Sequence, residues 1–364
     1  MGGCPPPIPP GPQAGGARCG WFDGSMPEYD AFLLVSFGGP EGPDDVMPFL
    51  ENVTRGRGIP RERLAGVAEH YYAVGGVSPI NQQCRDLLTA IRADFGASGL
   101  SLPVYWGNRN WTPYLTDTVR TMAADGVRRA VAFVTSAYSS YSSCRQYLDD
   151  IERARAAAGP DAPAIDKIRR FYDHPGFIEP FAASTRAALA ALPVGLRDGA
   201  HLVFTAHSIP VAMAEASGPG PARGRYVAEL TEAAGLITER VGGDPHPWTL
   251  AYQSRSGPPS QPWLEPDVGD VLGELAGSGT KAVVVVPVGF VSDHMEVRHD
   301  LDVEAARCAE SLGLAFARAA TPGCQPRFVS MITELVRERL ALPGQDCPAD
   351  CCRYAARPAG ASRA

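Results

Sequence analysis

Four short apolar runs of the same shape constrain the fold of this chain more than any other feature of its sequence. They occupy residues 29–40, 128–140, 199–210 and 280–293. Each passes from a buried, strand-sized segment into a loop of small and polar residues. Helical patterns separate them, for example at residues 81–95, 112–126 and 224–242. This alternation predicts an α/β fold with parallel sheets.

The runs also form two pairs, because the interval between the first two is comparable to the interval between the last two. The chain has 364 residues, more than the roughly 250–300 that one core usually holds. We therefore expect two similar, doubly wound Rossmann-like lobes with a boundary near residues 174–177. Because ligands bind at the carboxyl ends of parallel strands, the loops after the four runs should face one cleft between the lobes. The expected division is a disordered Pro/Gly-rich extension (1–28), an N-terminal lobe (29–175), a C-terminal lobe (176–340) and a cysteine-bearing tail (341–364).

Charge and hydropathy exclude several classes of function. A net charge of −7 gives no global basic field for nucleic acid. The longest apolar run, residues 282–291, falls short of the ~20 residues of a transmembrane segment. The N-terminus lacks the apolar core of a secretory signal, and Met26 is an alternative start. We expect a cytoplasmic protein in a reducing compartment, whose nine cysteines form no disulfide framework.

His207 stands at the carboxyl end of the third apolar run, before Ser208 and Pro210. A histidine at the end of a buried parallel strand points into the predicted cleft, where it can serve as a general base or a metal ligand. A histidine that caps a loop explains the position equally well.

An acidic stripe follows the fourth run. Glu296, Asp300 and Glu304 are spaced i, i+4 and i+8, so a helix places them along one face, and a local π-turn aligns them better. Carboxylates with a nearby imidazole suit a divalent metal such as iron in transit. The alternative is a solvated acidic face, which the position at the mouth of a buried strand disfavours. Asp293 and His294 begin the helix, with Asp293 a candidate N-cap.

The first half of the chain carries aromatic, hydroxyl and cationic candidates. In residues 70–81, Tyr71 precedes a Gly-Gly turn, and Ser78 precedes a helix opened by a proline. Arg55 and Arg57 belong to an arginine-rich segment that can bind carboxylates. An ordinary turn and a solvated basic loop are equally good interpretations.

Cysteines concentrate in two places that are far apart in the sequence. Cys144 lies in a Ser/Tyr-rich loop that also holds Tyr147, and on the residues alone it is a small buried hydrophobe. Cys347, Cys351 and Cys352 fall within six residues near the C-terminus.

Six motifs resemble those of ferrochelatases in order and spacing, from about residue 29 to residue 340. They are LLVSFGGPEGPDDVMPFL, HYYAVGGVSPIN, VYWGNRNWTPYL, FTAHSIP, YQSRSGPPSQPWLEPD and PVGFVSDHMEVRHDLDVE. The resemblance implies two Rossmann-like lobes with a porphyrin cleft between them. It also implies an enzyme that inserts Fe²⁺ into a porphyrin while two pyrrole N–H protons leave.

The resemblance also carries roles to individual positions. His207 matches the histidine assigned to metal binding and proton abstraction, and Glu296 matches the glutamate that faces it across the cleft. Asp300 and Glu304 fall on the family's acidic helix, proposed as a path for iron access or proton exit. The candidate porphyrin contacts are Ser78, Tyr147 and Tyr71.

Within the family, the chain is most similar to the actinobacterial branch, which implies coproporphyrin III as substrate and Fe-coproporphyrin III (coproheme) as product, passed on to a decarboxylase. Arg55 and Arg57 are candidates for binding its propionates. Protoporphyrin IX is the alternative substrate. A chelatase for another metal, such as cobalt, and a non-catalytic tetrapyrrole-binding sensor are further alternatives, although a sensor does not need both His207 and Glu296.

Some members of the family bind a [2Fe–2S] cluster through one body cysteine and three tail cysteines. By this resemblance, the ligands are Cys144, Cys347, Cys351 and Cys352. Tetrahedral zinc would satisfy the same thiolates, but the C-x3-C-C spacing is not that of the common zinc knuckle. A disordered tail with oxidation-prone cysteines is the remaining alternative.

Overall fold

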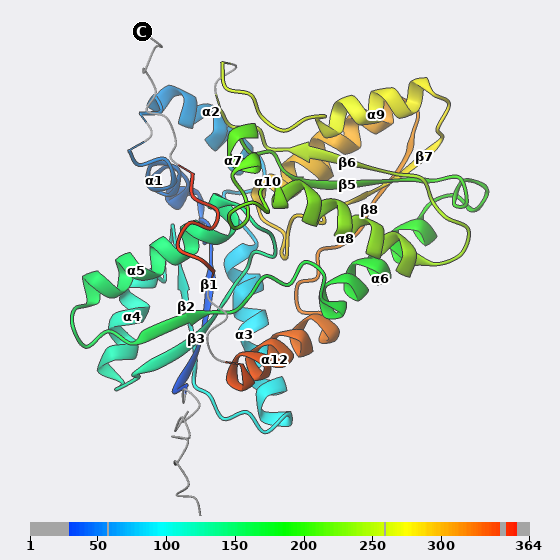
Figure 1. The fold of residues 1–364 in the computed structure, drawn as a ribbon. Coiled ribbons are helices and arrows are strands. Elements are labelled where there is room, and N and C mark those ends of the chain that lie inside the picture. Colours follow the sequence, from blue (N-terminus) through cyan, green and yellow to red (C-terminus); the bar gives the residue numbers. More distant parts are fainter. Residues whose placement is uncertain (1–28, 57, 258–259, 343–346, 355–364) are drawn as a thin grey trace, which may run out of the picture.

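The computed structural model describes residues 29–56, 58–257, 260–342 and 347–354. The expected extension at residues 1–28, Arg57 and parts of the tail lie outside the described residues. Within the described part of the chain, eight strands form two parallel sheets of four (Figure 1). The fold is therefore α/β with two doubly wound lobes, as the alternating pattern predicts.

The two sheets share one strand order. The first has the order β2-β1-β3-β4 and the second β6-β5-β7-β8. The strands of the first sheet are β1 (Ala31–Ser36), β2 (Val104–Asn108), β3 (Arg129–Val134) and β4 (Ala164–Lys167). Those of the second are β5 (His201–His207), β6 (Trp248–Gln253), β7 (Ala282–Val286) and β8 (Ala315–Arg318). The four apolar runs are thus the central strands β1, β3, β5 and β7, whose side chains are buried on both faces.

Helices cover both faces of each sheet. In the first half they are α1 (Pro43–Val53), α2 (Arg61–Tyr72), α3 (Ile80–Ala97), α4 (Leu115–Ala124), the π-helix η1 (Tyr141–Arg145) and α5 (Gln146–Ala158). In the second half they are α6 (Pro175–Ala191), the 3₁₀-helix η2 (Val194–Leu196), α7 (Val211–Glu215), α8 (Arg225–Val241), α9 (Val268–Gly277), α10 (Met295–Val297), the π-helix η3 (Arg298–Ala305), α11 (Ala306–Ser311) and α12 (Pro326–Ala341). None of the helices that the structure describes is long and apolar enough to cross a bilayer.

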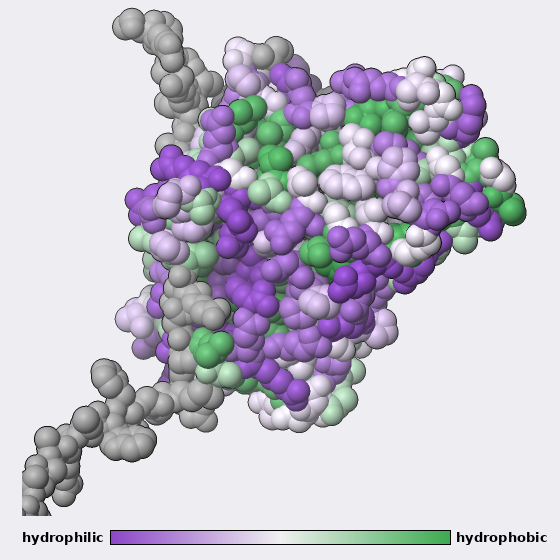
Figure 2. Space-filling model, turned by 45° about the vertical axis from the view of Figure 1, so that its right-hand side comes forward, coloured by the Kyte–Doolittle hydropathy of each residue, from purple (hydrophilic) through white to green (hydrophobic). Residues whose placement is uncertain are grey.

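The largest apolar cluster joins the two halves of the molecule. It contains Phe32 of β1 and Val284 of β7, and α12 packs against both α3 and α6. The predicted boundary near residues 174–177 coincides with the start of α6 and remains a prediction. The face drawn in Figure 2 is a mosaic, with hydrophilic residues gathered over its centre and lower half.

Candidate active site

The ends of two neighbouring strands bring His207 and Glu296 together. His207 is the last residue of β5, and Glu296 lies in α10, just after the loop that follows β7. The His207 Nε2 atom is 3.6 Å from a Glu296 carboxylate oxygen. Both side chains are partly exposed, at 33% and 48%. A base and a carboxylate therefore face each other where a substrate can reach them.

Backbone contacts fix the orientation of the His207 ring. Its Nδ1 contacts the Ser208 carbonyl, which can only accept, so Nδ1 carries the proton. This arrangement leaves Nε2, the atom nearest Glu296, free to accept a proton or bind a metal.

Both lobes contribute to the walls of this site. The Tyr138 hydroxyl, in the loop after β3, donates a hydrogen bond of 2.9 Å to the Val288 carbonyl after β7. Met295, next to Glu296, packs into the apolar cluster formed by α1 and α2, which includes Tyr71. The loops at the carboxyl ends of both sheets thus meet, as the parallel topology predicts.

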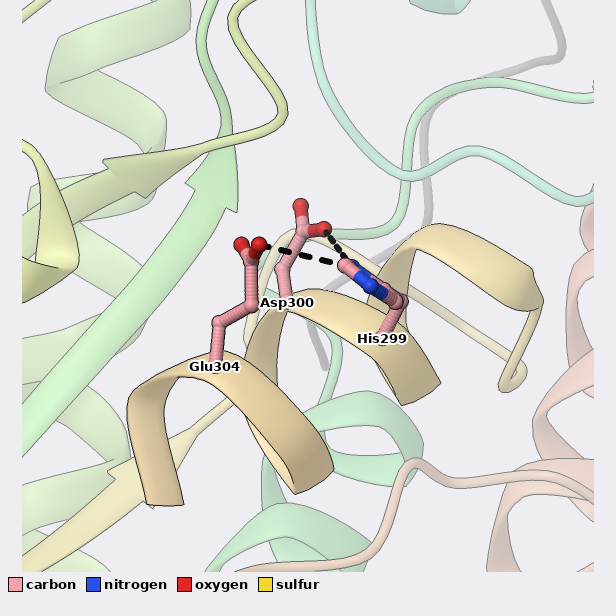
Figure 3. A group of neighbouring side chains, drawn as sticks. All are labelled: His299, Asp300 and Glu304. Carbon is pink, nitrogen blue, oxygen red and sulfur yellow. Dashed lines mark ion pairs between the residues drawn. The ribbon is translucent and has the colours of Figure 1, made fainter. Parts of the chain in front are cut away.

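A second polar group lies further along the same helical segment. Ligand atoms of His299, Asp300 and Glu304 all lie within 4.8 Å of one another (Figure 3). The His299 Nδ1 atom is 3.6 Å from an Asp300 carboxylate oxygen and 3.8 Å from one of Glu304. The three side chains could hold a metal ion between an imidazole and two carboxylates.

The π-helix η3 explains why this group forms. Its wider turn brings residues five apart onto one side, which places His299 and Glu304 beside each other. The local π-turn expected from the sequence is confirmed, but the i, i+4, i+8 stripe was drawn from carboxylates alone and leaves out His299. The one available signal is the imidazole directly before Asp300.

His299 is also held from the other lobe. Its ring stacks on that of His70 from α2, with centroids 3.9 Å apart and planes 6° from parallel. His299 Nδ1 is buried and, among the described residues, has no hydrogen-bond partner. The ring is thus fixed in place with a ring nitrogen near the two carboxylates.

Asp300 is the most buried carboxylate of the stripe. Its side chain is 18% exposed, against 48% for Glu296 and 63% for Glu304. The Ser254 hydroxyl and the Gln253 amide donate to it. Burial, with repulsion from Glu296 and Glu304, still raises the pKa of Asp300 from 3.8 to about 6.

This raised pKa predicts that Asp300→Asn stabilises the metal-free protein at high pH. In the wild-type protein the folded state binds the Asp300 proton more tightly than the unfolded state does, so the stability that this proton contributes is complete below pH 3.8 and is lost as pH rises through about 6. Asparagine stays neutral and does not suffer this loss. The change corresponds to on the order of 3 kcal/mol. Urea unfolding with a metal chelator should show the variant more stable than wild type by about that amount at pH 8, and nearly equal at pH 4.

The exposed Asp161→Asn variant is the control for a charge change without burial. It should not alter the difference between the two pH values. If Asp300→Asn showed the same gain at pH 4 as at pH 8, a cause other than ionisation would account for it.

The start of this helical segment differs from the expectation in one detail. The N-cap of α10 is His294, whose ring accepts from the Val297 N–H, rather than Asp293. Asp293 is instead paired with Arg318 at 3.0 Å and accepts from the Thr321 hydroxyl. Asp293 follows β7 beside the end of β8, and this ion pair competes successfully with capping.

The predicted porphyrin contacts lie in the first lobe with different exposures. Ser78 is buried, and its N–H donates to the Pro40 carbonyl in the loop after β1. Tyr71 is buried among α1 and α2, and burial, with contributions from Glu296 and Asp300, raises its pKa. Arg55 is exposed at the end of α1.

Tyr147 is covered by a residue that sequence analysis does not identify. The Arg109 guanidinium lies 4.5 Å from the centre of the Tyr147 ring and 5.6 Å from that of Phe37. Arg109 also forms an ion pair with Asp150. A buried arginine thus lies over two rings, those of Tyr147 and Phe37. In the sequence, the only indication of Arg109 is the polar stretch that follows β2.

The four candidate cluster cysteines come together across about two hundred residues of sequence. Cys144 in η1 is buried, as are Cys351 and Cys352, whose sulfurs are 3.7 Å apart. The Cys144 thiol donates a hydrogen bond to Cys347, and this bond, with burial, raises the pKa of Cys144. Donation from Cys144 and Cys351 holds the pKa of Cys347 well below its usual range.

Polar contacts hold the tail segment against the fold. Arg145 donates to the Ala349 carbonyl at 2.9 Å, and the Gly218 N–H lies 3.1 Å from the Cys352 sulfur. Tyr354 accepts from the Gln261 amide at 3.1 Å. The red segment in Figure 1 accordingly lies between α5 and α7. The tail therefore bridges η1 of the first lobe and two loops of the second.

Relatives of this chain by sequence carry the name of one family. The sequence profile of the ferrochelatase family matches residues 29–340. A protein of Streptomyces coelicolor named coproporphyrin III ferrochelatase is 54% identical over 360 residues, covering 92% of this chain and 96% of its own length. A protein of Frankia alni with the same name is 58% identical over 338 residues, covering 89% of this chain and 86% of its own.

Solved structures support the fold at much lower identity. SirB from Bacillus subtilis with Fe³⁺ has a TM-score of 0.54 and 12% identity, with 86% of this chain and 96% of that chain covered. The sirohydrochlorin chelatase SirB in complex with cobalt, from Bacillus subtilis subspecies spizizenii, has a TM-score of 0.51 and 12% identity, covering 87% of this chain and 97% of that one. From the profile match and the curated relatives, the chain belongs to the ferrochelatase family.

Proposed function

We propose that this protein inserts Fe²⁺ into coproporphyrin III and releases Fe-coproporphyrin III, with the loss of two protons. The names of curated relatives at 53–58% identity support this substrate. The observation that carries the proposal is the His207–Glu296 pair, 3.6 Å apart at the strand ends of a ferrochelatase fold.

The two side chains of this pair have complementary roles in the proposed reaction. His207 Nε2 accepts a pyrrole proton, because its Nδ1 is already engaged as a donor. Glu296 stabilises the resulting imidazolium and offers a carboxylate to the incoming Fe²⁺. Each proton that leaves the ring then passes through His207 toward solvent, and the metal takes its place.

We propose that Fe²⁺ reaches this pair along the helical segment. Glu304 is exposed, and with His299 and Asp300 it presents one nitrogen and two oxygen ligands at the surface end. Asp300 and Glu304 have ligand atoms within 4.8 Å of each other, and the negative charges of Glu304 and Glu296 both raise the pKa of Asp300. The cation can therefore exchange water for protein ligands stepwise as it moves inward.

The first lobe is the proposed wall for the macrocycle. Ser78, Tyr71 and Tyr147 are proposed contacts, with Arg109 over the Tyr147 ring. Arg55 and Arg57 are the proposed partners of the propionates, since guanidinium binds carboxylates through paired hydrogen bonds. The product keeps its propionates, so a decarboxylase is the proposed next enzyme, in the cytoplasm.

The substrate proposal predicts faster metalation of coproporphyrin III than of protoporphyrin IX. Under anaerobic conditions with Fe²⁺, absorbance should show a kcat/KM at least roughly tenfold higher for the ring with four propionates, because a site built for four charged groups disfavours a ring that has apolar vinyl groups in place of two of them. His207→Ala protein gives the background of uncatalysed metalation. A preference for protoporphyrin IX would overturn the substrate, and no metalation of either ring would overturn the enzyme itself.

We further propose that Cys144, Cys347, Cys351 and Cys352 bind a [2Fe–2S] cluster. The 3.7 Å spacing of the Cys351 and Cys352 sulfurs suits two thiolates on one metal atom. Among the described residues, His299, Asp300 and Glu304 are the one group of three or more ligands within 4.8 Å, so the four thiols are more widely spread than that. One tetrahedral zinc ion needs all four sulfurs about 3.8 Å apart, whereas a two-iron cluster holds them as two separated pairs.

A further inference from the structure

His70 is a histidine of the first lobe that touches the proposed iron path without being one of its ligands. Its ring lies over that of His299, with centroids 3.9 Å apart and planes 6° from parallel. Among the described residues, the group whose ligand atoms all lie within 4.8 Å of one another contains His299, Asp300 and Glu304 but not His70. His70 therefore supports the face of the His299 ring and adds no fourth ligand.

The His299 ring depends on this support for its orientation. A histidine that binds a metal is usually held by a hydrogen bond on its second nitrogen, which fixes the plane of the ring. In the part of the chain that the structure describes, His299 Nδ1 has no hydrogen-bond partner, and Nε2 forms no hydrogen bond either. Oxygens of Asp300 and Glu304 lie 3.6 and 3.8 Å from Nδ1, too far for a hydrogen bond. The stack is therefore the contact that orients this ring.

The helix that carries His70 is itself anchored to the same segment. Met295, four residues before His299, belongs to the apolar cluster formed by α1 and α2, in which Ala68 and Tyr71 are also buried. Residues four apart lie on one face of a helix, so Met295 and His299 are presented on the same side. The first lobe thus meets this segment at two successive turns, through an apolar cluster and through the ring stack.

From this geometry we infer that His70 is a positioning residue for the capture of Fe²⁺. By stacking on His299, it holds the imidazole where Nδ1 and the two carboxylates can bind the cation together. The inference rests on the proposed iron path. Without the stack the ring gains rotamer freedom, which the incoming cation must then remove. His70 should therefore act on the affinity for Fe²⁺ and leave the chemical step at His207 unchanged.

The first test separates KM from kcat. His70→Ala should raise the KM for Fe²⁺ about fivefold, in the range of a lost ring stack, and leave kcat at saturating Fe²⁺ within about twofold of wild type. Anaerobic initial rates with coproporphyrin III, followed by absorbance, measure both constants. His70→Phe keeps a flat ring and removes the nitrogens, so it should restore a KM near that of wild type.

His246→Ala is the matched control for the loss of a histidine. His246 precedes β6, at the end of the second sheet opposite His207, and its ring contacts the Ala200 carbonyl at 2.9 Å. Both constants should stay near those of wild type in this variant. Circular dichroism of each variant checks that the fold is kept.

The second test measures binding without turnover. Mn²⁺ is the probe, because carboxylates bind it well and thiolates poorly. All proteins carry His207→Ala, which weakens the inner pair as a competing site. Electron paramagnetic resonance of free Mn²⁺ should show a Kd about fivefold higher when His70→Ala is added, and a Kd near the starting value with His70→Phe.

Three results would overturn the inference. They are an unchanged KM for Fe²⁺ in His70→Ala, a fall in its kcat with KM unchanged, and a loss of affinity in His70→Phe as large as in His70→Ala. Glu304→Gln separates these failures from a failure of the iron path. If Glu304→Gln also leaves the KM for Fe²⁺ unchanged, the path itself is wrong, and if it raises that KM while His70→Ala does not, only the role of His70 is wrong.

Discussion

Replacing His207 with alanine should reduce the rate of Fe²⁺ insertion by about 10²–10⁴-fold, the range typical of a lost general base. The reason is geometric, because Nε2 is the free ring nitrogen and lies 3.6 Å from Glu296, and both side chains are partly exposed. Without the imidazole, the pyrrole protons have no acceptor at this point and the metal loses a ligand. Initial rates of absorbance change with coproporphyrin III and Fe²⁺, at saturating concentrations of both, measure the effect.

A second histidine on the same strand provides the control. His201 begins β5, at the opposite end of the strand from His207, and its ring contacts the Thr249 hydroxyl. His201→Ala should therefore keep a rate within a few-fold of wild type. If His207→Ala retained near-wild-type activity while binding the porphyrin normally, His207 would have no catalytic role.

Cys144→Ser should abolish the cluster, although the other three ligands are untouched. A serine oxygen is a poor ligand for a soft iron–sulfur centre, and Cys144 is the one ligand that comes from the body of the enzyme. The purified variant should lose its iron–sulfur absorption, and its iron and sulfide content should fall to near zero. Cys352→Ser should give the same result.

Cys84 offers a control of equal burial, since Cys84 and Cys144 are both 3% exposed. Cys84→Ser should keep its cluster. Retention of the full iron content in Cys144→Ser would show that another ligand completes the site, and zinc in the wild-type protein would replace the cluster assignment altogether.

The central strands were predictable from sequence because they are buried on both faces and therefore apolar throughout. The edge strands were not. β4, for example, has four residues and includes Asp166 and Lys167, so it gives no apolar run. Tertiary pairing with β3 makes it a strand, through contacts that no local pattern contains.

The candidate site likewise contains residues whose positions the sequence predicts and residues whose positions it does not. The meeting of His207 and Glu296 follows from a general rule about the carboxyl ends of parallel strands. The positions of His299 and Arg109 do not, because one depends on a π-helix and the other on stacking between distant aromatic rings. The N-cap at Asp293 was wrong because an ion pair with Arg318 competes for that side chain. The joining of Cys144 to the tail was implied by family resemblance, and no spacing in the sequence indicates it.

The shared strand order of the two sheets has a consequence for how specificity can change. β1 and β5 are counterparts, yet β1 ends at Ser36, with Phe37 after it, whereas β5 ends at His207. The proposed metal ligands of the cleft all come from the second copy of this scaffold, and the proposed ring contacts come from the first. Selection for a different metal and selection for a different macrocycle would therefore act on separate halves of the gene, so that either preference could evolve while the other is kept.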